Sequence, residues 1–283
     1  MLKIDGLKKV YGDFQLDLSM EVPTGQITGL IGRNGAGKTT AFKAILGLIK
    51  KDFGRILLFN KDVEKINAED KKRLGVVLSD SGFSNYYTVK DIMDILQSFY
   101  DNFDKNHFEY LIHNYGLPKD KKLKEFSTGM NAKLKLAVAI SHNADLLILD
   151  EPTAGLDVIA RGELLEILRE FMEKDENKSI LISSHISSDL ENLCDYIYMI
   201  DEGKIVFYED TDILLSNYAV LKVDDLVYNN MDKKYILKKR SEGYGYSLLT
   251  NEKRFYVENY PGIVIEKGNI DELMNMMIRG ENI

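Results

Sequence analysis

The sequence predicts an α/β protein built around a parallel β-sheet, and three observations support this fold class. A β-type run, Ile27–Ile31, leads through closely spaced glycines into a helix that begins near Gly37. Two short apolar runs, 146–149 and 179–182, are typical of strands buried on both faces of a parallel sheet. Polar residues directly follow all three runs, as they do at the ligand-binding edge of an open α/β sheet.

Length and composition are those of an ordinary globular protein. The chain has 283 residues, enough for one large domain or for one large and one small domain. Because no apolar run approaches the length of a membrane span and the N-terminus does not resemble a signal peptide, a membrane role is expected to need a partner chain. A net charge of −8 argues against a nucleic-acid partner. The single cysteine, Cys194, excludes an internal disulfide and is expected to be buried.

The glycine-rich stretch after residue 31 matches the phosphate-binding loop in composition and spacing. Glycines let the backbone curl so that its N–H groups point at phosphate oxygens, and the following helix N-terminus adds a partial positive charge. In such a loop Lys38 reaches the β- and γ-phosphates and the Thr39 hydroxyl ligates Mg²⁺. A simple glycine turn is the alternative, but the Lys-Thr pair in register argues against it. The predicted phosphate-binding residues are Gly32, Arg33, Asn34, Gly35, Ala36, Gly37, Lys38, Thr39 and Thr40.

Up to residue 142 the pattern changes from strands to helices. Alternating strands are expected at 2–5 and 14–22, with short strands at 55–59 and 75–78. From Thr88 the apolar period becomes helical, and Asp91 stands at the capping-box position. The apolar face of this helix comprises Ile92, Ile95, Leu96 and Phe99. A second helix ends at 116–118 and a third begins after Gly129, so 85–142 is predicted to be a helical insertion.

After residue 142 the buried strands alternate with helices at about 159–174 and 188–193, and a hairpin around 201–203 closes a domain spanning 1–210. Strand-like segments then follow at 221–223, 235–238, 246–249, 255–258 and 263–266. Asn269 caps a final helix, with Glu272 at the capping-box position, that is expected to bury Ile270, Leu273, Met274 and Met277. Residues 211–283 are therefore predicted to form a small α+β accessory domain with a structural or dimer-contact role.

Polar residues at the ends of three sequence-distant strands are expected to converge on one phosphate. Asp150 suits a water-mediated contact with Mg²⁺, and Glu151 is placed to polarise a water in line with the γ-phosphate. His185 is expected to contact the γ-phosphate from the far side, the alternative being a hydrogen-bonded core histidine.

This order of motifs resembles the ATP-binding subunit of an ABC (ATP-binding cassette) transporter over residues 1–210. The resemblance implies a P-loop NTPase cassette with an N-terminal antiparallel β subdomain, a parallel core sheet and a helical insertion, followed here by the C-terminal α+β appendage. It assigns the Walker A motif to 32–40 and the Walker B motif to 146–151, and it implies that ATP and Mg²⁺ are the cofactors. It makes Glu151 the catalytic glutamate, His185 the switch histidine and Asp157 part of the D-loop. Tyr11 takes the place of the aromatic residue that stacks on adenine, although a tyrosine in a turn or in the core is the alternative.

The chain departs from the family pattern at two places. The signature motif at 124–130 keeps Ser127 and Gly129, which the resemblance assigns to nucleotide binding, but it lacks the usual Leu, Gly and Gln at three other positions. This variant resembles the branch of ABC-2-type exporters, which includes bacterial peptide and antibiotic efflux systems. Ser79 stands where the family has the metal-contacting glutamine of the Q-loop, with Asp80 next to it. Either Asp80 supplies a carboxylate on the metal side, or water fills this place.

The resemblance also implies the partners. In the family the signature motif binds the nucleotide of the opposite subunit, so a homodimer or a heterodimer with a paralogous ATPase subunit is expected. A separate transmembrane permease would hold the chain, as a cytoplasmic protein, at the inner face of the cell membrane and would carry out export. Segment 79–87 corresponds to the groove for the permease, and Phe83 and Tyr87 either line that groove or pack in the core. The rival functions are a soluble ABC ATPase acting on ribosomes or DNA and a regulatory ATPase without transport.

Overall fold

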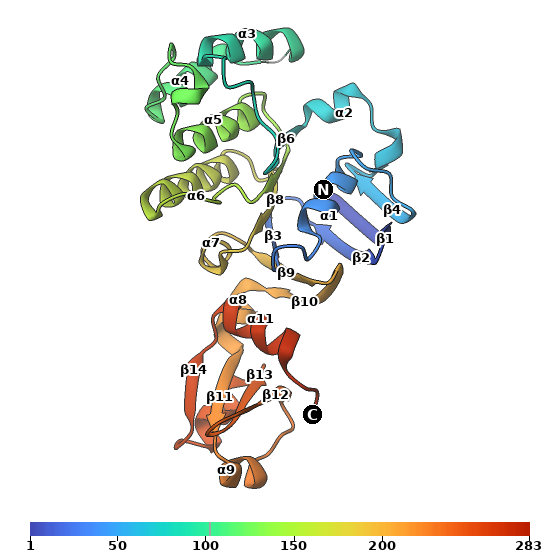
Figure 1. The fold of residues 1–283 in the computed structure, drawn as a ribbon, viewed down its shortest axis with the longest axis vertical. Coiled ribbons are helices and arrows are strands. Elements are labelled where there is room, and N and C mark those ends of the chain that lie inside the picture. The colour runs from blue at the N-terminus through green and yellow to red at the C-terminus, as the bar shows by residue number, and fades with distance from the viewer. Residues whose placement is uncertain (102) are drawn as a thin grey trace.

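The computed structural model describes residues 1–101 and 103–283. Figure 1 shows a large upper part and a smaller lower part. Ten segments of the upper part form one mixed sheet. Apolar side chains alternate along strands such as β2 and run continuously along β7, as expected for half-buried and fully buried strands. Its spatial order is β5 (Lys61–Asp62), β4 (Phe53–Leu58), β1 (Leu2–Tyr11), β2 (Phe14–Val22), β10 (Lys204–Asp210), β9 (Tyr196–Asp201), β3 (Ile27–Ile31), β8 (Ser179–Ser184), β7 (Leu146–Asp150) and β6 (Leu74–Val77).

The parallel half of this sheet confirms the predicted core. Strands β3, β8, β7 and β6 pair in parallel, and every residue of β3, β7 and β8 is buried. Strands β1, β2 and β4 pair antiparallel, as predicted for the N-terminal part. Parallel pairing brings the carboxyl ends of β3, β7 and β8 to one edge, where the predicted polar residues follow.

Helices surround the sheet, and three of them form the predicted insertion at the top of Figure 1. These are α3 (Val89–Phe99), α4 (Lys105–Asn114) and α5 (Thr128–Ile140). The other helical segments of the upper part are α1 (Lys38–Ile45), η1 (Val63–Lys65), α2 (Ala68–Lys72), η2 (Leu123–Glu125), α6 (Val158–Glu173) and α7 (Ser187–Glu191). Cys194 is buried, as predicted. Within the described residues, no helix combines the length and the apolar character needed to span a bilayer.

Helix α3 confirms its predicted cap but not its whole predicted face. The Thr88 side chain accepts a hydrogen bond from the Asp91 amide, and the Asp91 side chain accepts one from the Thr88 amide. Together these two bonds form a complete capping box. Ile92 and Leu96 are buried, whereas Phe99 is 72% exposed. Phe99 is the last residue of the helix, and the following residue, Tyr100, takes the inward place by stacking on His142 at 4.4 Å between ring centroids.

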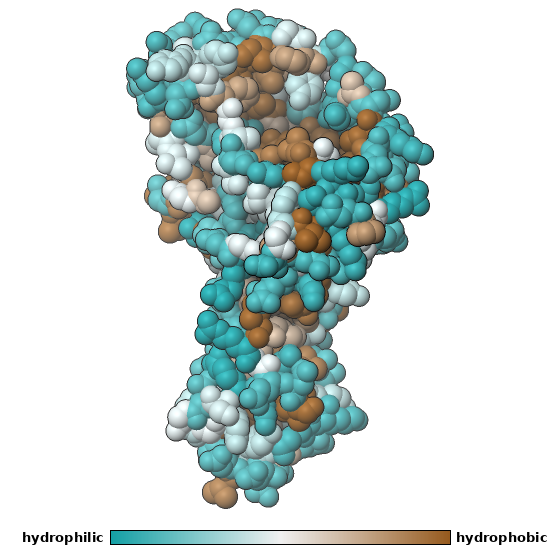
Figure 2. Space-filling model, turned by 45° about the vertical axis from the view of Figure 1, so that its right-hand side comes forward, coloured by the Kyte–Doolittle hydropathy of each residue, from teal (hydrophilic) through white to brown (hydrophobic). Residues whose placement is uncertain are grey.

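Residues after 210 fold around a second sheet of four antiparallel strands. Its spatial order is β12 (Ile236–Glu242), β13 (Gly245–Thr250), β11 (Ala219–Val223) and β14 (Val264–Lys267). The accompanying helices are α8 (Thr211–Asn217), α9 (Asp225–Asn230), α10 (Lys253–Asn259) and α11 (Ile270–Arg279). The molecule narrows between its two parts, where α8 and α11 lie (Figures 1 and 2).

Two predictions for this region are corrected. The predicted strand at 255–258 is helix α10, because Tyr256 is fully buried on one side while Arg254 and Glu258 form an ion pair across one helical turn. Aromatic residues favour strands, but here tertiary packing overrides that preference. In α11 the Asn269 cap is confirmed.

The residues that α11 buries completely are Ile270, Leu273 and Met276, whereas Met274 and Met277 are only partly buried. The fully buried residues are therefore spaced three apart, starting at Ile270, and this spacing places Met276 in the core in place of the two predicted methionines.

Candidate functional site

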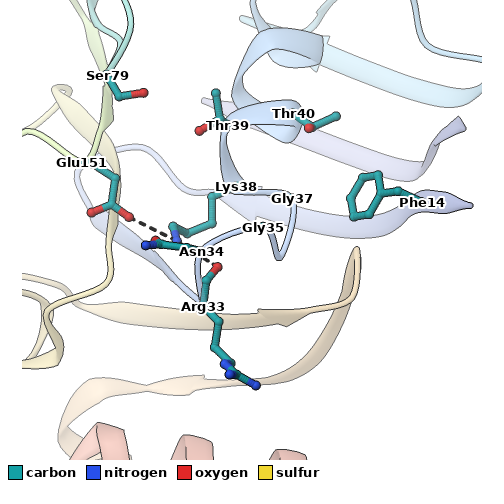
Figure 3. A pocket seen from close by; sticks show the side chains of 10 residues that line it. All are labelled: Phe14, Arg33, Asn34, Gly35, Gly37, Lys38, Thr39, Thr40, Ser79 and Glu151. Atoms are coloured by element: carbon teal, nitrogen blue, oxygen red, sulfur yellow. Dashed lines mark hydrogen bonds and ion pairs between the residues drawn. The ribbon is translucent and has the colours of Figure 1, made fainter. Parts of the chain in front are cut away.

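The loop between β3 and α1 has the backbone of a phosphate-binding loop. Gly35 and Gly37 have φ angles of 84° and 111°, in the region that favours glycine. A Cβ atom at Gly32 would lie 2.4 Å from the carbonyl oxygen of Ile200, so only glycine fits there. The loop borders a hollow of about 360 Å³. Figure 3 shows the residues lining it, which are Phe14, Arg33, Asn34, Gly35, Gly37, Lys38, Thr39, Thr40, Ser79 and Glu151.

Lys38 lies at the centre of this site. Its side chain is almost fully buried, and Nζ donates to the carbonyl oxygens of Gly32 at 2.6 Å and Arg33 at 3.3 Å. The Lys38 ammonium also lies 3.1 Å from Oε1 of Glu151. Figure 3 shows these two side chains pointing toward each other, while the Arg33 side chain points away from them. A buried cation in a cradle of backbone groups is suited to binding an anion.

Asp150, the last residue of β7, organises the hydroxyls around the hollow. Its Oδ2 accepts hydrogen bonds from Thr39 Oγ1 at 2.7 Å and from Ser79 Oγ at 3.0 Å. Its Oδ1 accepts one from Ser183 Oγ at 2.7 Å, and the side chain is nearly inaccessible to solvent. A carboxylate beside a threonine and a serine hydroxyl is a set of oxygen ligands that fits Mg²⁺.

Glu151 and His185 form the third part of the site. Glu151 has a φ of 53°, a left-handed conformation that is uncommon for a residue other than glycine. Its amide donates to Ser183 Oγ at 3.0 Å. Its Oε2 lies 2.5 Å from Nδ1 of His185 and accepts from the His185 amide at 3.2 Å. The structure thus brings Lys38, Asp150, Glu151 and His185 together, as the strand-end argument predicted.

Two residues predicted for the chain's own nucleotide site, Tyr11 and Asp80, do not line the hollow. Tyr11 is not among the residues that line the hollow; it is about half exposed, with the Lys9 ammonium 5.1 Å from its ring centroid. Phe14, across the same hairpin, provides the aromatic side chain of the hollow. This reflects the register of the hairpin, in which Tyr11 and Phe14 are paired and only Phe14 faces the loop.

Asp80 is likewise absent from the lining of the hollow. Its carboxylate forms an ion pair with Lys43 of α1 at 2.6 Å, and this cation holds the pKa of Asp80 below its usual value. Ser79, the neighbouring residue, contacts Asp150 instead. The sequence marked Ser79 only as a departure from the family pattern, and it placed Ser183 among the polar residues at a strand end without a role of its own. Phe14 was missed as a site residue, because a single aromatic residue carries no motif.

The signature residues lie outside this hollow. Ser127 caps α5 by accepting from the Met130 amide at 3.2 Å, and it is exposed. Asp157 caps α6 in the same way, at 2.9 Å from the Ala160 amide. A Cβ atom at Gly129 would lie 3.3 Å from Cβ of Ala160, so these two helix starts are packed closely together. Ala36 is buried and lines a second hollow of about 940 Å³ beside the loop.

The fold and the site together define a P-loop nucleotide-binding protein. The family model described as "ABC transporter" matches residues 16–154. The chain is 33% identical over 226 residues to the ABC transporter ATP-binding protein YtrB of Bacillus subtilis (strain 168), an alignment that covers 79% of this chain and 76% of YtrB. It is 37% identical over 216 residues to the lantibiotic transport ATP-binding protein SrtF of Streptococcus pyogenes, covering 75% of this chain and 92% of SrtF.

A solved structure of the ATP-binding subunit of an ABC transporter superposes with a TM-score of 0.67 at 26% identity, covering 76% of this chain and 92% of that one. The chain therefore belongs to the ATP-binding subunits of ABC transporters, a family of ATPases. The predicted family, fold and enzyme class are confirmed.

Proposed function

We propose that this chain hydrolyses ATP with Mg²⁺ and thereby drives a separate transmembrane permease that exports a peptide, an antibiotic or another amphipathic compound. The observation that carries the ATPase mechanism is the contact of Glu151 with both Lys38 and His185 beside the phosphate-binding loop. The export direction rests on the relatives, because SrtF is named for lantibiotic transport. A relative from Bacillus licheniformis, 37% identical over 210 residues, is named for bacitracin transport.

The residues present fit a magnesium nucleotide. Gly35 and Gly37 leave the loop free of side chains at positive φ, and Lys38 supplies the cation for the phosphates. The Thr39 hydroxyl and Asp150 would hold the metal. The Ser79 hydroxyl, which donates to Asp150, would take the place at the metal that was predicted for Asp80. When bound, Mg²⁺ would neutralise charge on the β- and γ-phosphate oxygens.

In the proposed mechanism Glu151 accepts a proton from a water whose oxygen attacks the γ-phosphorus of ATP, while the bond from that phosphorus to the β–γ bridging oxygen breaks and ADP leaves. His185 orients the Glu151 carboxylate through Nδ1 and the backbone amide, which together hold Oε2. Lys38 shifts from Glu151 to the phosphates and so frees Oε1 for the water. The test is a phosphate-release assay on the purified chain, in which hydrolysis requires Mg²⁺; hydrolysis at the same rate in a chelator would contradict the proposed metal residues.

We further propose that two subunits pair so that Ser127 of each reaches the nucleotide of the other. Ser127 is exposed at the N-terminus of α5 and outside its own hollow, so a partner can use it. The partner is a second copy or a paralogous ATPase subunit. A solved structure titled as a dimer with ADP and Pi shares this fold with a TM-score of 0.66 at 18% identity.

Replacing Ser127 with arginine is expected to abolish hydrolysis while leaving ATP affinity of the monomer unchanged. A long cation at this exposed helix start would block the partner's nucleotide but would not touch the subunit's own loop. Equilibrium binding of a fluorescent ATP analogue, measured beside phosphate release, separates the two effects. Loss of binding by the monomer would show that Ser127 acts within its own subunit.

We propose the following organisation for the whole chain. Residues 1–210, including the helical insertion at 85–142, act as the ATPase domain, and 211–283 act as an accessory domain. The permease holds the chain at the inner face of the cell membrane. Segment 79–87 is the proposed docking region for the permease, because Tyr86 and Tyr87 are 71% and 40% exposed there.

Replacing Tyr87 with aspartate is expected to weaken binding to the permease by about 2 kcal/mol or more, the size of a hot-spot effect. Phe83 packs partly against the main core, so its replacement by aspartate is expected to lower the melting temperature as well. The measurement is co-purification with the permease, set beside the melting temperature and ATP affinity of the free subunit. A stable Tyr87 variant that co-purifies fully would place the contact elsewhere.

A further inference from the structure

The first turn of α11 holds the short helix α7 at both of its ends. At the beginning of α7, Ser187 Oγ donates to Oδ2 of Asp271 at 2.8 Å. At its end, Oε1 of Glu191 accepts from the Ile270 amide at 2.8 Å. A carboxylate at the N-terminus of α11 is also favoured by the helix dipole. These two bonds join a helix of the accessory region to a helix of the ATPase region.

Helix α7 depends on such outside contacts for its position. It has five residues, and its N-cap, Ile186, provides no side-chain bond. A helix this short is not stable alone, so tertiary contacts determine where it lies. On another side of α7 the buried Asp189 carboxylate lies 3.7 Å from Nε of Arg161 in α6. Helix α7 is therefore held between α6 and α11.

The position of α7 matters because His185 precedes it by two residues. Ser187 is bonded to Asp271, while His185 holds Oε2 of Glu151 through its ring and its amide. One short segment thus carries both contacts, and only Ile186 separates the residue bonded to α11 from the histidine.

Helix α11 is itself firmly seated. Ile270, Leu273 and Met276 are 0–1% exposed, and the helix packs against α7, β10, β11 and β12. At its far end Ile278 lines the second hollow, beside Arg33 of the phosphate-binding loop. The helix therefore contacts α7 at its beginning and, near its end, borders a hollow that the phosphate-binding loop also lines.

We propose that α11 is a positioning element of the ATPase site, in which Asp271, through Ser187, keeps His185 aligned with Glu151. Asp271 touches no reacting group and is a positioning residue. The inference rests on the ATPase function proposed above. It gives the accessory region a direct route to the rate of hydrolysis.

The test uses the full chain with Asp271→Ala and a matched control, Asp212→Ala. Asp212 is likewise an exposed acidic residue at the second position of a helix, α8, and within the described residues it forms no ion pair or side-chain hydrogen bond. Asp271→Ala is expected to lower kcat about tenfold, the effect of one lost hydrogen bond to a charged group, with KM for ATP unchanged. The control is expected to keep the kcat of the unsubstituted chain.

Two further variants separate positioning from a general loss of structure. Asp271→Asn keeps an oxygen that accepts from Ser187, so it is expected to restore kcat. The double variant Ser187→Ala with Asp271→Ala is expected to be no slower than Asp271→Ala alone, because both changes remove one bond. A kcat for Asp271→Ala equal to that of the control, or additive losses in the double variant, overturns the inference while leaving the ATPase function intact. Absence of hydrolysis by the unsubstituted chain contradicts the function itself.

Discussion

Replacing Glu151 with glutamine is expected to slow ATP hydrolysis by about 10²–10⁴-fold, the usual effect of losing a general base. The amide has nearly the same size as the carboxylate, and its oxygen can still accept from the His185 amide. The site should therefore still assemble and bind ATP. Phosphate release under single-turnover conditions measures the loss directly.

The same variant is expected to accumulate as an ATP-bound dimer, since ATP that bridges two subunits is no longer consumed. Size-exclusion chromatography should show a dimer with Mg-ATP and a monomer with ADP. Rapid turnover by the variant, or a monomer in Mg-ATP, would falsify the role given to Glu151.

Replacing Lys38 with alanine is expected to weaken ATP binding by about a hundredfold or more, because charge-assisted hydrogen bonds to two phosphate groups are lost. Lys38 is the buried cation of a loop otherwise made of backbone dipoles. A matched control is Lys43→Ala, on the same helix, which removes an ammonium that pairs with Asp80 instead. Titration with a fluorescent ATP analogue should show near-normal affinity for the control; normal affinity for Lys38→Ala would contradict the loop assignment.

The parts of the fold that could be predicted are those in which local pattern and tertiary packing agree. Strand β7 has four consecutive apolar residues, and α3 begins with a complete capping box. In α10 the aromatic residues Phe255 and Tyr256 favour a strand locally, yet their packing against Tyr260 requires a helix. Phe99 is a second example: it fits the apolar period of α3 but is exposed, because the period does not show where along the helix the contact with the core ends.

Some residues of the site could be predicted from the sequence and others could not. Lys38, Asp150, Glu151 and His185 could be predicted, because each lies at the carboxyl end of a buried parallel strand or in the segment that follows it, and such strands share one edge. The position of the Asp80 carboxylate could not be predicted, since it depends on the ion pair with Lys43, which lies on a helix far away in the sequence. Likewise the register of the β1–β2 hairpin places Phe14 at the hollow, and the sequence alone does not reveal that register.

The most direct test of the proposed shared site is to mix the Lys38→Ala and Ser127→Arg proteins, each of which is expected to be inactive alone at ATP concentrations too low to fill the Lys38→Ala loop. A mixed dimer combines the intact loop of one subunit with the intact Ser127 of the other and so contains one complete site. At equal amounts with random pairing, phosphate release is expected to recover to about a quarter of the unsubstituted rate, if the two sites of a dimer act independently. No recovery at any mixing ratio, with mixed dimers demonstrated by differential tagging, would contradict the account.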